Sequence, residues 1–69
     1  MEPLEAAVAV LRQDGGALHW TVIQDRALRG GFIDPFATPD VRKRLLEALA
    51  EGVRAGLLIR DGKGSYRLA

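Results

Sequence analysis

The chain has 69 residues, 48% of them hydrophobic, and a formal net charge of +1, so we expect residues 1–69 to form one small domain. Because there is no cysteine and only one histidine, disulfides, thiolate metal sites and histidine clusters are excluded, and we expect neither a metal nor a cofactor. No apolar run reaches the roughly 18 residues of a membrane span, and the acidic start does not resemble a signal peptide. We therefore expect a cytoplasmic protein without a membrane partner.

The charges are unevenly distributed along the chain. Up to Asp40, three arginines stand against six acidic residues, a net charge of −3, whereas residues 41–69 hold seven cations and three acids, a net charge of +4. Such segregation indicates an anionic partner. A solvated surface with internal ion pairs gives the same count, so both interpretations stay open.

The first predicted element is a helix from Pro3 to Gln13. Proline suits the first helical position, and Asp14, Gly15 and Gly16 supply the stop. The apolar residues follow the spacing of one helical face: Leu4, Ala7, Val8 and Leu11.

A short extended piece, residues 17–19, precedes a second predicted helix from about Trp20 to Arg29, which Gly30 and Gly31 end. The start of this helix has two interpretations. Thr21 and Gln24 match a capping box, while His19 could cap the helix one turn earlier. The residues expected to face inward are Ile23, Ala27 and Leu28.

The segment that follows is too rich in proline for a helix and too apolar for an ordinary exposed loop, so Phe32, Ile33 and Phe36 are expected to anchor it to the core. Thr38, Pro39 and Asp40 then predict a helix start, with a capping hydroxyl, a first-turn proline and an acid. The third helix runs to Gly56. Its apolar repeat is Val41, Leu45, Leu49 and Val53, with Leu46 beside it.

The last element is a β-hairpin around Asp61 and Gly62. A two-residue turn pairs Leu57 with Tyr66, and a four-residue turn, Asp61 to Gly64, pairs Ile59 with Tyr66. Both registers place Leu57, Ile59, Tyr66 and Leu68 on an inner face, and both turn Arg60, Lys63 and Arg67 outward. Together with the helices this predicts a core of Val8, Leu11, Leu18, Ile23, Phe36, Leu45, Leu49, Ile59 and Tyr66.

Three helices, a short strand after the first helix and a C-terminal hairpin make an α+β fold of the winged helix-turn-helix type. The chain from about residue 4 to residue 69 resembles the HARE-type helix-turn-helix domains of restriction endonucleases, chromatin proteins and the RNA polymerase delta subunit. The matching residues are Leu18, His19, Trp20 and Ile23, the Thr38-Pro39 pair, and Gly62, Lys63, Gly64, Tyr66 and Leu68. This resemblance implies a small module that binds DNA or recruits DNA-handling proteins.

No catalytic set is expected. The sequence around Lys63 lacks the earlier glycine of a phosphate-binding loop and precedes a strand rather than a helix. His19 with Asp14 or Asp25 has no cysteine to activate, and Ser65 is the only serine. Trp20 is expected to be mostly buried, with an exposed stacking platform as the alternative.

Double-stranded DNA is the partner that we expect. The third helix of a winged helix commonly enters the major groove, so Arg42, Lys43 and Arg44 are the predicted groove contacts and Arg60, Lys63 and Arg67 the predicted wing contacts. In the opposing interpretation Lys43 and Arg44 pair with Glu47 and the face is merely solvated. The alternative function is a protein-interaction adaptor with the same fold, whose partner is RNA polymerase or another protein.

Overall fold

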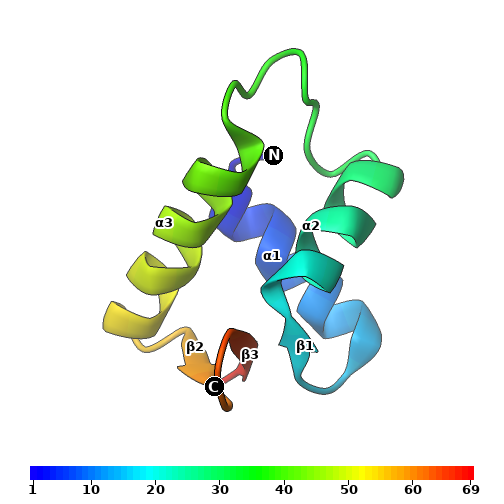
Figure 1. The fold of residues 1–69 in the computed structure, drawn as a ribbon. Helices are drawn as coiled ribbons and strands as arrows, with labels where there is room; N and C mark the ends of the chain where they lie inside the picture. The colour runs from blue at the N-terminus through cyan, green and yellow to red at the C-terminus, as the bar shows by residue number, and fades with distance from the viewer.

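The computed structural model describes residues 1–69 and contains three helices and a three-stranded antiparallel sheet, which confirms the α+β prediction (Figure 1). The elements follow in the order α1 (Pro3–Asp14), β1 (Leu18–His19), α2 (Trp20–Arg29), α3 (Val41–Arg54), β2 (Leu58–Arg60) and β3 (Ser65–Leu68). The strand order in the sheet is β1-β3-β2. None of the helices has the length and apolar character needed to span a membrane.

Helix α1 packs against both α2 and α3 and supplies the largest share of the core. Pro3 lies in its first turn as predicted, and the backbone N–H of Gly15 donates to Leu11 O at its end. The fully buried face consists of Ala6, Ala7, Val10 and Leu11, while Leu4 and Val8 are only partly buried. The buried stripe is therefore rotated toward Ala6 and Val10 relative to the predicted one.

His19 caps α2, which decides between the two predicted starts. Its ring Nδ1 lies 3.3 Å from the backbone nitrogen of Thr21 and 2.8 Å from the Thr21 hydroxyl. Gln24 does not complete a capping box, because its buried Oε1 has no hydrogen-bond partner. Strand β1 thus passes directly into α2 through a histidine that is both its last residue and the helix cap.

Two predictions about the segment before α3 are wrong. The helix begins at Val41 rather than at Thr38-Pro39, and its N-cap residue is Asp40, with φ 53° and no side-chain cap bond. The reason is a separate turn closed by Asp34, whose carbonyl accepts from the backbone nitrogens of Ala37 and Thr38 at 3.1 and 3.0 Å. Thr38 therefore belongs to that turn and not to the helix.

Phe36 does not anchor this segment to the core, because its side chain is 97% exposed. The carboxylate of Asp34 accepts from the Phe36 backbone N–H at 2.9 Å, which fixes Phe36 at the outside of the turn. Ile33 is buried as predicted and Phe32 is partly buried. The segment is thus held by its first residues alone.

The hairpin adopts neither predicted register. Asp61 N donates to Ser65 O at 2.9 Å, so the loop consists of three residues, Gly62, Lys63 and Gly64. The aligned partners are Leu58 with Leu68, Ile59 with Arg67 and Arg60 with Tyr66. Because strand side chains alternate, a shift by one residue exchanges the faces of β2.

The burial of the β2 residues shows that the inner and outer faces of this strand are exchanged relative to the prediction. Leu58 is 2% exposed, whereas Ile59 is 38% and Leu57 51% exposed, so the predicted places of Leu57 and Ile59 on the inner face are wrong. Of the other predicted core residues, Leu11, Ile23, Leu45, Leu49 and Tyr66 are buried, and Val8 and Leu18 are partly buried. Val53, in the predicted repeat of α3, is 36% exposed.

Gly52 on the inner side of α3 allows the helix to lie close to β2 and α1. A Cβ at this position would stand 2.8 Å from Leu58 Cδ1 and 2.9 Å from Leu4 Cδ1. The buried leucine of β2 therefore occupies the space that a side chain on α3 would otherwise fill. This close approach fixes the hairpin against the helical layer.

The register predicts a contrast between two neighbouring residues of β2. Leu58→Ala should lower the free energy of unfolding by about 2–5 kcal/mol, because it removes a fully buried side chain, whereas Ile59→Ala should cost less than about 1 kcal/mol. Urea unfolding followed by circular dichroism measures both. Equal costs, or a larger cost at Ile59, would contradict the register.

Candidate nucleic-acid interface

The three consecutive cations of α3 point in three directions. Successive helical residues are rotated by about 100°, so Arg42, Lys43 and Arg44 cannot share one face. Arg42 lies toward α2, Arg44 lines a groove beside α1, and Lys43 lies between them on the outer side of the helix. Lys43 therefore shares one surface depression with Arg42 and another with Arg44, and of the three only Arg44 also lies beside α1.

Arg42 stacks on the first residue of α2. Its guanidinium carbon lies 5.6 Å from the centroid of the Trp20 ring, within the range of a cation–π interaction. Trp20 is only partly buried, so it both packs against the core and offers a face to Arg42. Its ring therefore links α2 to the first turn of α3, a partial match to the stacking-platform alternative.

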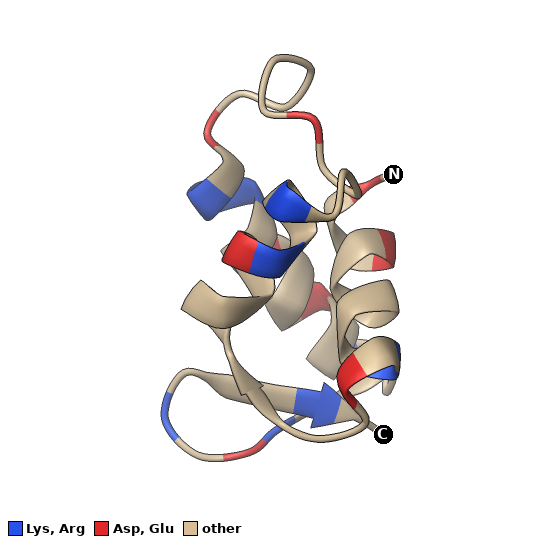
Figure 2. Ribbon diagram, turned by 90° about the vertical axis from the view of Figure 1, so that its right-hand side faces the viewer, with Lys and Arg blue, Asp and Glu red and all other residues tan.

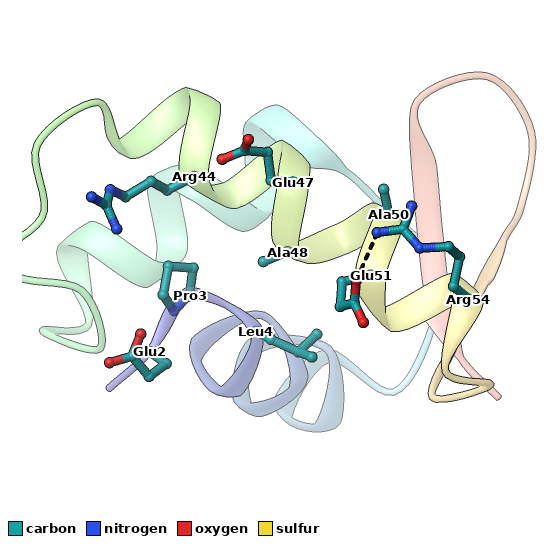
Figure 3. Close-up of a pocket in the computed structure, with 9 residues that line it drawn as sticks. All are labelled: Glu2, Pro3, Leu4, Arg44, Glu47, Ala48, Ala50, Glu51 and Arg54. Atoms are coloured by element: carbon teal, nitrogen blue, oxygen red, sulfur yellow. Dashed lines mark hydrogen bonds and ion pairs between the residues drawn. The ribbon is translucent and has the colours of Figure 1, made fainter.

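Arg44 faces a different environment. It lines an open groove of about 520 Å³ between the start of α1 and α3, together with Glu2, Glu47, Glu51 and Arg54 (Figure 3). Neither Lys43 nor Arg44 forms an ion pair with Glu47, and the ion pair along this face joins Arg54 to Glu51 at 2.6 Å. The groove carries carboxylates and guanidinium groups but no serine, threonine or histidine that could act as a nucleophile or a base.

The hairpin cations also differ in their surroundings. Lys63 is exposed in the loop and has no ion-pair partner. Arg67 lies 3.8 Å from a carboxylate oxygen of Asp61. Arg60 does not point to the outer face as predicted, because the register places it beside Tyr66: its guanidinium lies 5.7 Å from the ring centroid and donates to the phenol oxygen at 3.4 Å.

The hairpin loop docks on the start of α2. The backbone N–H of Trp20 donates to Gly64 O at 2.9 Å, which continues the β1–β3 pairing of His19 with Ser65. A Cβ on Gly64 would lie 2.7 Å from His19 Nε2 and 3.4 Å from Trp20 Cδ1. Gly64 therefore gives the loop room to reach the histidine cap and the tryptophan ring.

These contacts join the hairpin loop and the first turn of α3 into one surface. We call it the Trp20 surface and define it as His19, Trp20, Arg42, Lys43 and Lys63. Figure 2 shows the basic start of α3 and the hairpin loop projecting on the same side of the molecule, with α1 on the opposite side. The surface thus combines cations from two distant parts of the sequence: Arg42 stacks on the Trp20 ring, and Lys63 stands next to Gly64, whose carbonyl oxygen accepts from Trp20 N.

The cations could be identified from the sequence, but the contact that positions Arg42 could not. The stacking of Arg42 on Trp20 joins residues 22 positions apart and depends on how α2 and α3 pack. The helical period of α3 was a usable signal for the separation of Arg44 from Arg42. No group of three or more histidine, cysteine or acidic side chains is placed to hold a metal ion.

Two glycines of the hairpin loop test its docking on α2. Both have positive φ, 86° at Gly62 and 75° at Gly64, but only at Gly64 would a Cβ meet another side chain. Both alanine variants should lose about 1–2 kcal/mol for the left-handed backbone, and Gly64→Ala should in addition displace His19 and Trp20. Because Trp20 is the only tryptophan, its fluorescence emission should shift in Gly64→Ala and not in Gly62→Ala. The same emission in both variants would contradict the docking.

Comparison with known proteins identifies no relative of this chain: no family model, curated protein or solved structure matches it. The resemblance to HARE-type domains therefore stays a prediction. The function is inferred from the residues and geometry of the chain alone.

Proposed function

We propose that the chain binds double-stranded DNA as a winged helix-turn-helix module, with α3 as the recognition helix and the β2–β3 hairpin as the wing. The observation that carries this proposal is the Trp20 surface, where Arg42 stacks on Trp20 and the start of α3 lies on the same side of the molecule as the hairpin loop. The element order and the HARE-type motifs support the same assignment. The module would serve as a regulator or as the targeting part of a larger system.

In this proposal the first turn of α3 enters the major groove. Arg42 and Lys43 reach base edges or phosphates there, since arginine and lysine pair well with guanine. Glu47 and Glu51 follow on the same helix, where both line the groove beside α1 and Glu47 also lies next to Lys43, and both would repel phosphates. The helix is therefore suited to a shallow approach through its N-terminal end, and Arg44, at the α1 side, to a phosphate at the edge of the groove.

The wing supplies affinity that does not depend on sequence. Lys63 is the cation best placed for a phosphate because no acid neutralises it, whereas Arg67 must exchange Asp61 for the phosphate. An exposed pair such as Arg67–Asp61 is worth less than about 1 kcal/mol, so this exchange is accessible. Arg60 would contribute through the position of Tyr66 and the local potential rather than by a contact at the wing tip.

A protein-interaction adaptor is the second candidate function, and Phe36 is the observation that favours it. Eleven residues separate α2 from α3, where a DNA-binding helix-turn-helix usually has three or four. This long connection holds a 97% exposed phenylalanine on a turn closed by Asp34, with Asp40 farther along. Exposed aromatic residues are frequent anchors in protein interfaces, and the two acids disfavour phosphate.

The salt dependence of binding tests the DNA proposal. Titration of the protein with a duplex at several salt concentrations, followed by amide chemical shifts, should give weak to moderate binding with a log–log slope of about −2 to −5. The shifted amides should lie at the start of α3 and in the hairpin loop. No saturable shift at about 50 mM salt would contradict DNA binding and favour the adaptor.

Alanine variants separate the roles of the two parts of the surface. Lys63→Ala, and more strongly the triple change at Arg60, Lys63 and Arg67, should weaken binding equally for all duplexes and reduce the salt slope by up to about one unit per phosphate contact. Arg42→Ala and Lys43→Ala should instead alter sequence preference.

The matched control is Arg12→Ala, which removes an exposed cation without an ion-pair partner from α1. Arg12 lies beside Arg67 but is not part of the Trp20 surface. This variant should leave the slope unchanged. Phe36→Ser should leave DNA binding unchanged and should weaken binding only to a protein partner. An equal loss of DNA affinity in Arg12→Ala and Lys63→Ala would show that only overall charge matters, against the proposed interface.

A further inference from the structure

The outer side of α1 forms an apolar groove together with Leu57, which lies between α3 and β2. The groove has a volume of about 550 Å³, and its apolar lining consists of Met1, Leu4, Val8, Ala9 and Leu57. Met1 is 67% and Leu57 51% exposed. Large apolar side chains that cluster at the surface of a small domain indicate an interaction site.

The charged residues at the rim of this groove differ in sign between its two ends. Glu2 and Glu5 lie at the end near the N-terminus and Arg12 lies at the other end. None of the three forms an ion pair, and the nearby Asp14 is already paired with Arg26 at 3.1 Å. One end of the groove therefore carries uncompensated negative charge and the other end uncompensated positive charge.

The acidic and basic residues of this stretch of α1 lie at equal distances from its middle. Glu5 and Arg12 are seven residues apart, about two helical turns, so they share the outward side of α1. Val8 and Ala9 stand halfway between them. A helix with this pattern is complementary to itself when a second one lies antiparallel to it, because each acidic end then meets a basic end.

We propose that the occupant of this groove is a second copy of the chain, with the two α1 helices antiparallel about a two-fold axis that passes between Val8 and Ala9. In this arrangement Glu5 of each copy meets Arg12 of the other, and the apolar lining of the groove, including Leu57 and Met1, is covered by the second copy. The small side chain of Ala9 permits a close approach of the helices. A two-fold axis makes both halves of the contact identical, as in most homodimers.

Other occupants fit the groove less well. An anionic lipid surface would be repelled by Glu2 and Glu5, and a peptide of a single charge sign would satisfy only one end of the groove. The second copy satisfies both ends with residues already present. The groove lies along α1, and α1 lies on the side opposite the start of α3 and the hairpin loop (Figure 2). Both surfaces therefore remain available at once, and the dimer does not depend on the proposed function.

Sedimentation equilibrium of the 69-residue chain tests the proposal. The contact is small, so we expect a weak dimer with a dissociation constant of about 0.1–1 mM, and Leu57→Lys should leave only monomer. The matched control is Val22→Lys on α2, since Val22 is also exposed (36%) but lies outside the groove; it should dimerise like the unaltered chain. Monomer alone at about 2 mM, or a dimer lost in Val22→Lys and kept in Leu57→Lys, would overturn the proposal.

Charge reversal tests the antiparallel arrangement separately. Glu5→Arg and Arg12→Glu should each weaken the dimer about tenfold, because each places like charges opposite one another, and the double variant should recover most of the affinity. Glu5→Arg also removes a 3.4 Å hydrogen bond from Glu2 N to Glu5 Oε1, so thermal unfolding of the dilute monomer must show that each variant is folded. No recovery in a folded double variant would overturn the antiparallel pairing.

Discussion

The position of the hairpin depends on β3, which is the middle strand and pairs with both β1 and β2. The β1 side of this pairing is short, Leu18 with Tyr66 and His19 with Ser65, and the bond from Trp20 N to Gly64 O extends it to the first residue of α2. Because β1 runs directly into α2, the same ladder that closes the sheet also fixes the hairpin loop beside the Trp20 ring. Without it, Lys63 and Arg42 would belong to separate surfaces.

The elements governed by local chemistry could be predicted from the sequence. The bounds of α1 and α2 follow from Pro3, from the glycines after each helix and from the apolar periodicity. The structure confirms them, except that α1 includes Asp14, which was predicted to be part of the stop. The hairpin register could not be predicted, because the Asp-Gly-Lys-Gly segment accommodates loops of two, three or four residues. The three-residue loop is the one that brings Leu58 into the space left by Gly52, a contact between elements that no local pattern encodes.

The same distinction applies to the connection before α3 and to the candidate site. Phe36 is a large apolar residue of the kind usually found in a core, but the hydrogen bonds that Asp34 accepts from the backbone turn it outward. Sequence periodicity carries no information about such a turn. The cations of α3 and the hairpin were evident from the sequence. Their division into a stacked Arg42, an outer Lys43 and an Arg44 beside α1 follows partly from the helical period, whereas the partner of Arg42 required the packing of α2 against α3.

The ion pairs show which of the unevenly distributed charges remain unpaired, and counting charges along the sequence does not show this. Four pairs, Asp14–Arg26, Asp25–Arg29, Glu51–Arg54 and Asp61–Arg67, neutralise charges close to one another. The cations left without an ion pair are Arg12, Arg42, Lys43, Arg44, Arg60 and Lys63, and all but Arg12 lie in the first turn of α3 or in the hairpin.

The acids left without a pair are Glu2, Glu5, Asp34, Asp40 and Glu47, and four of the five lie at the start of α1 or in the connection before α3. Individual exposed pairs contribute little to stability, but they decide which charges remain to act on a partner. The remaining field is positive at the hairpin and at the first turn of α3, and negative at the start of α1. The proposed DNA-binding surface thus lies where the unpaired charges are positive, and the proposed dimer surface includes the unpaired acids at the start of α1.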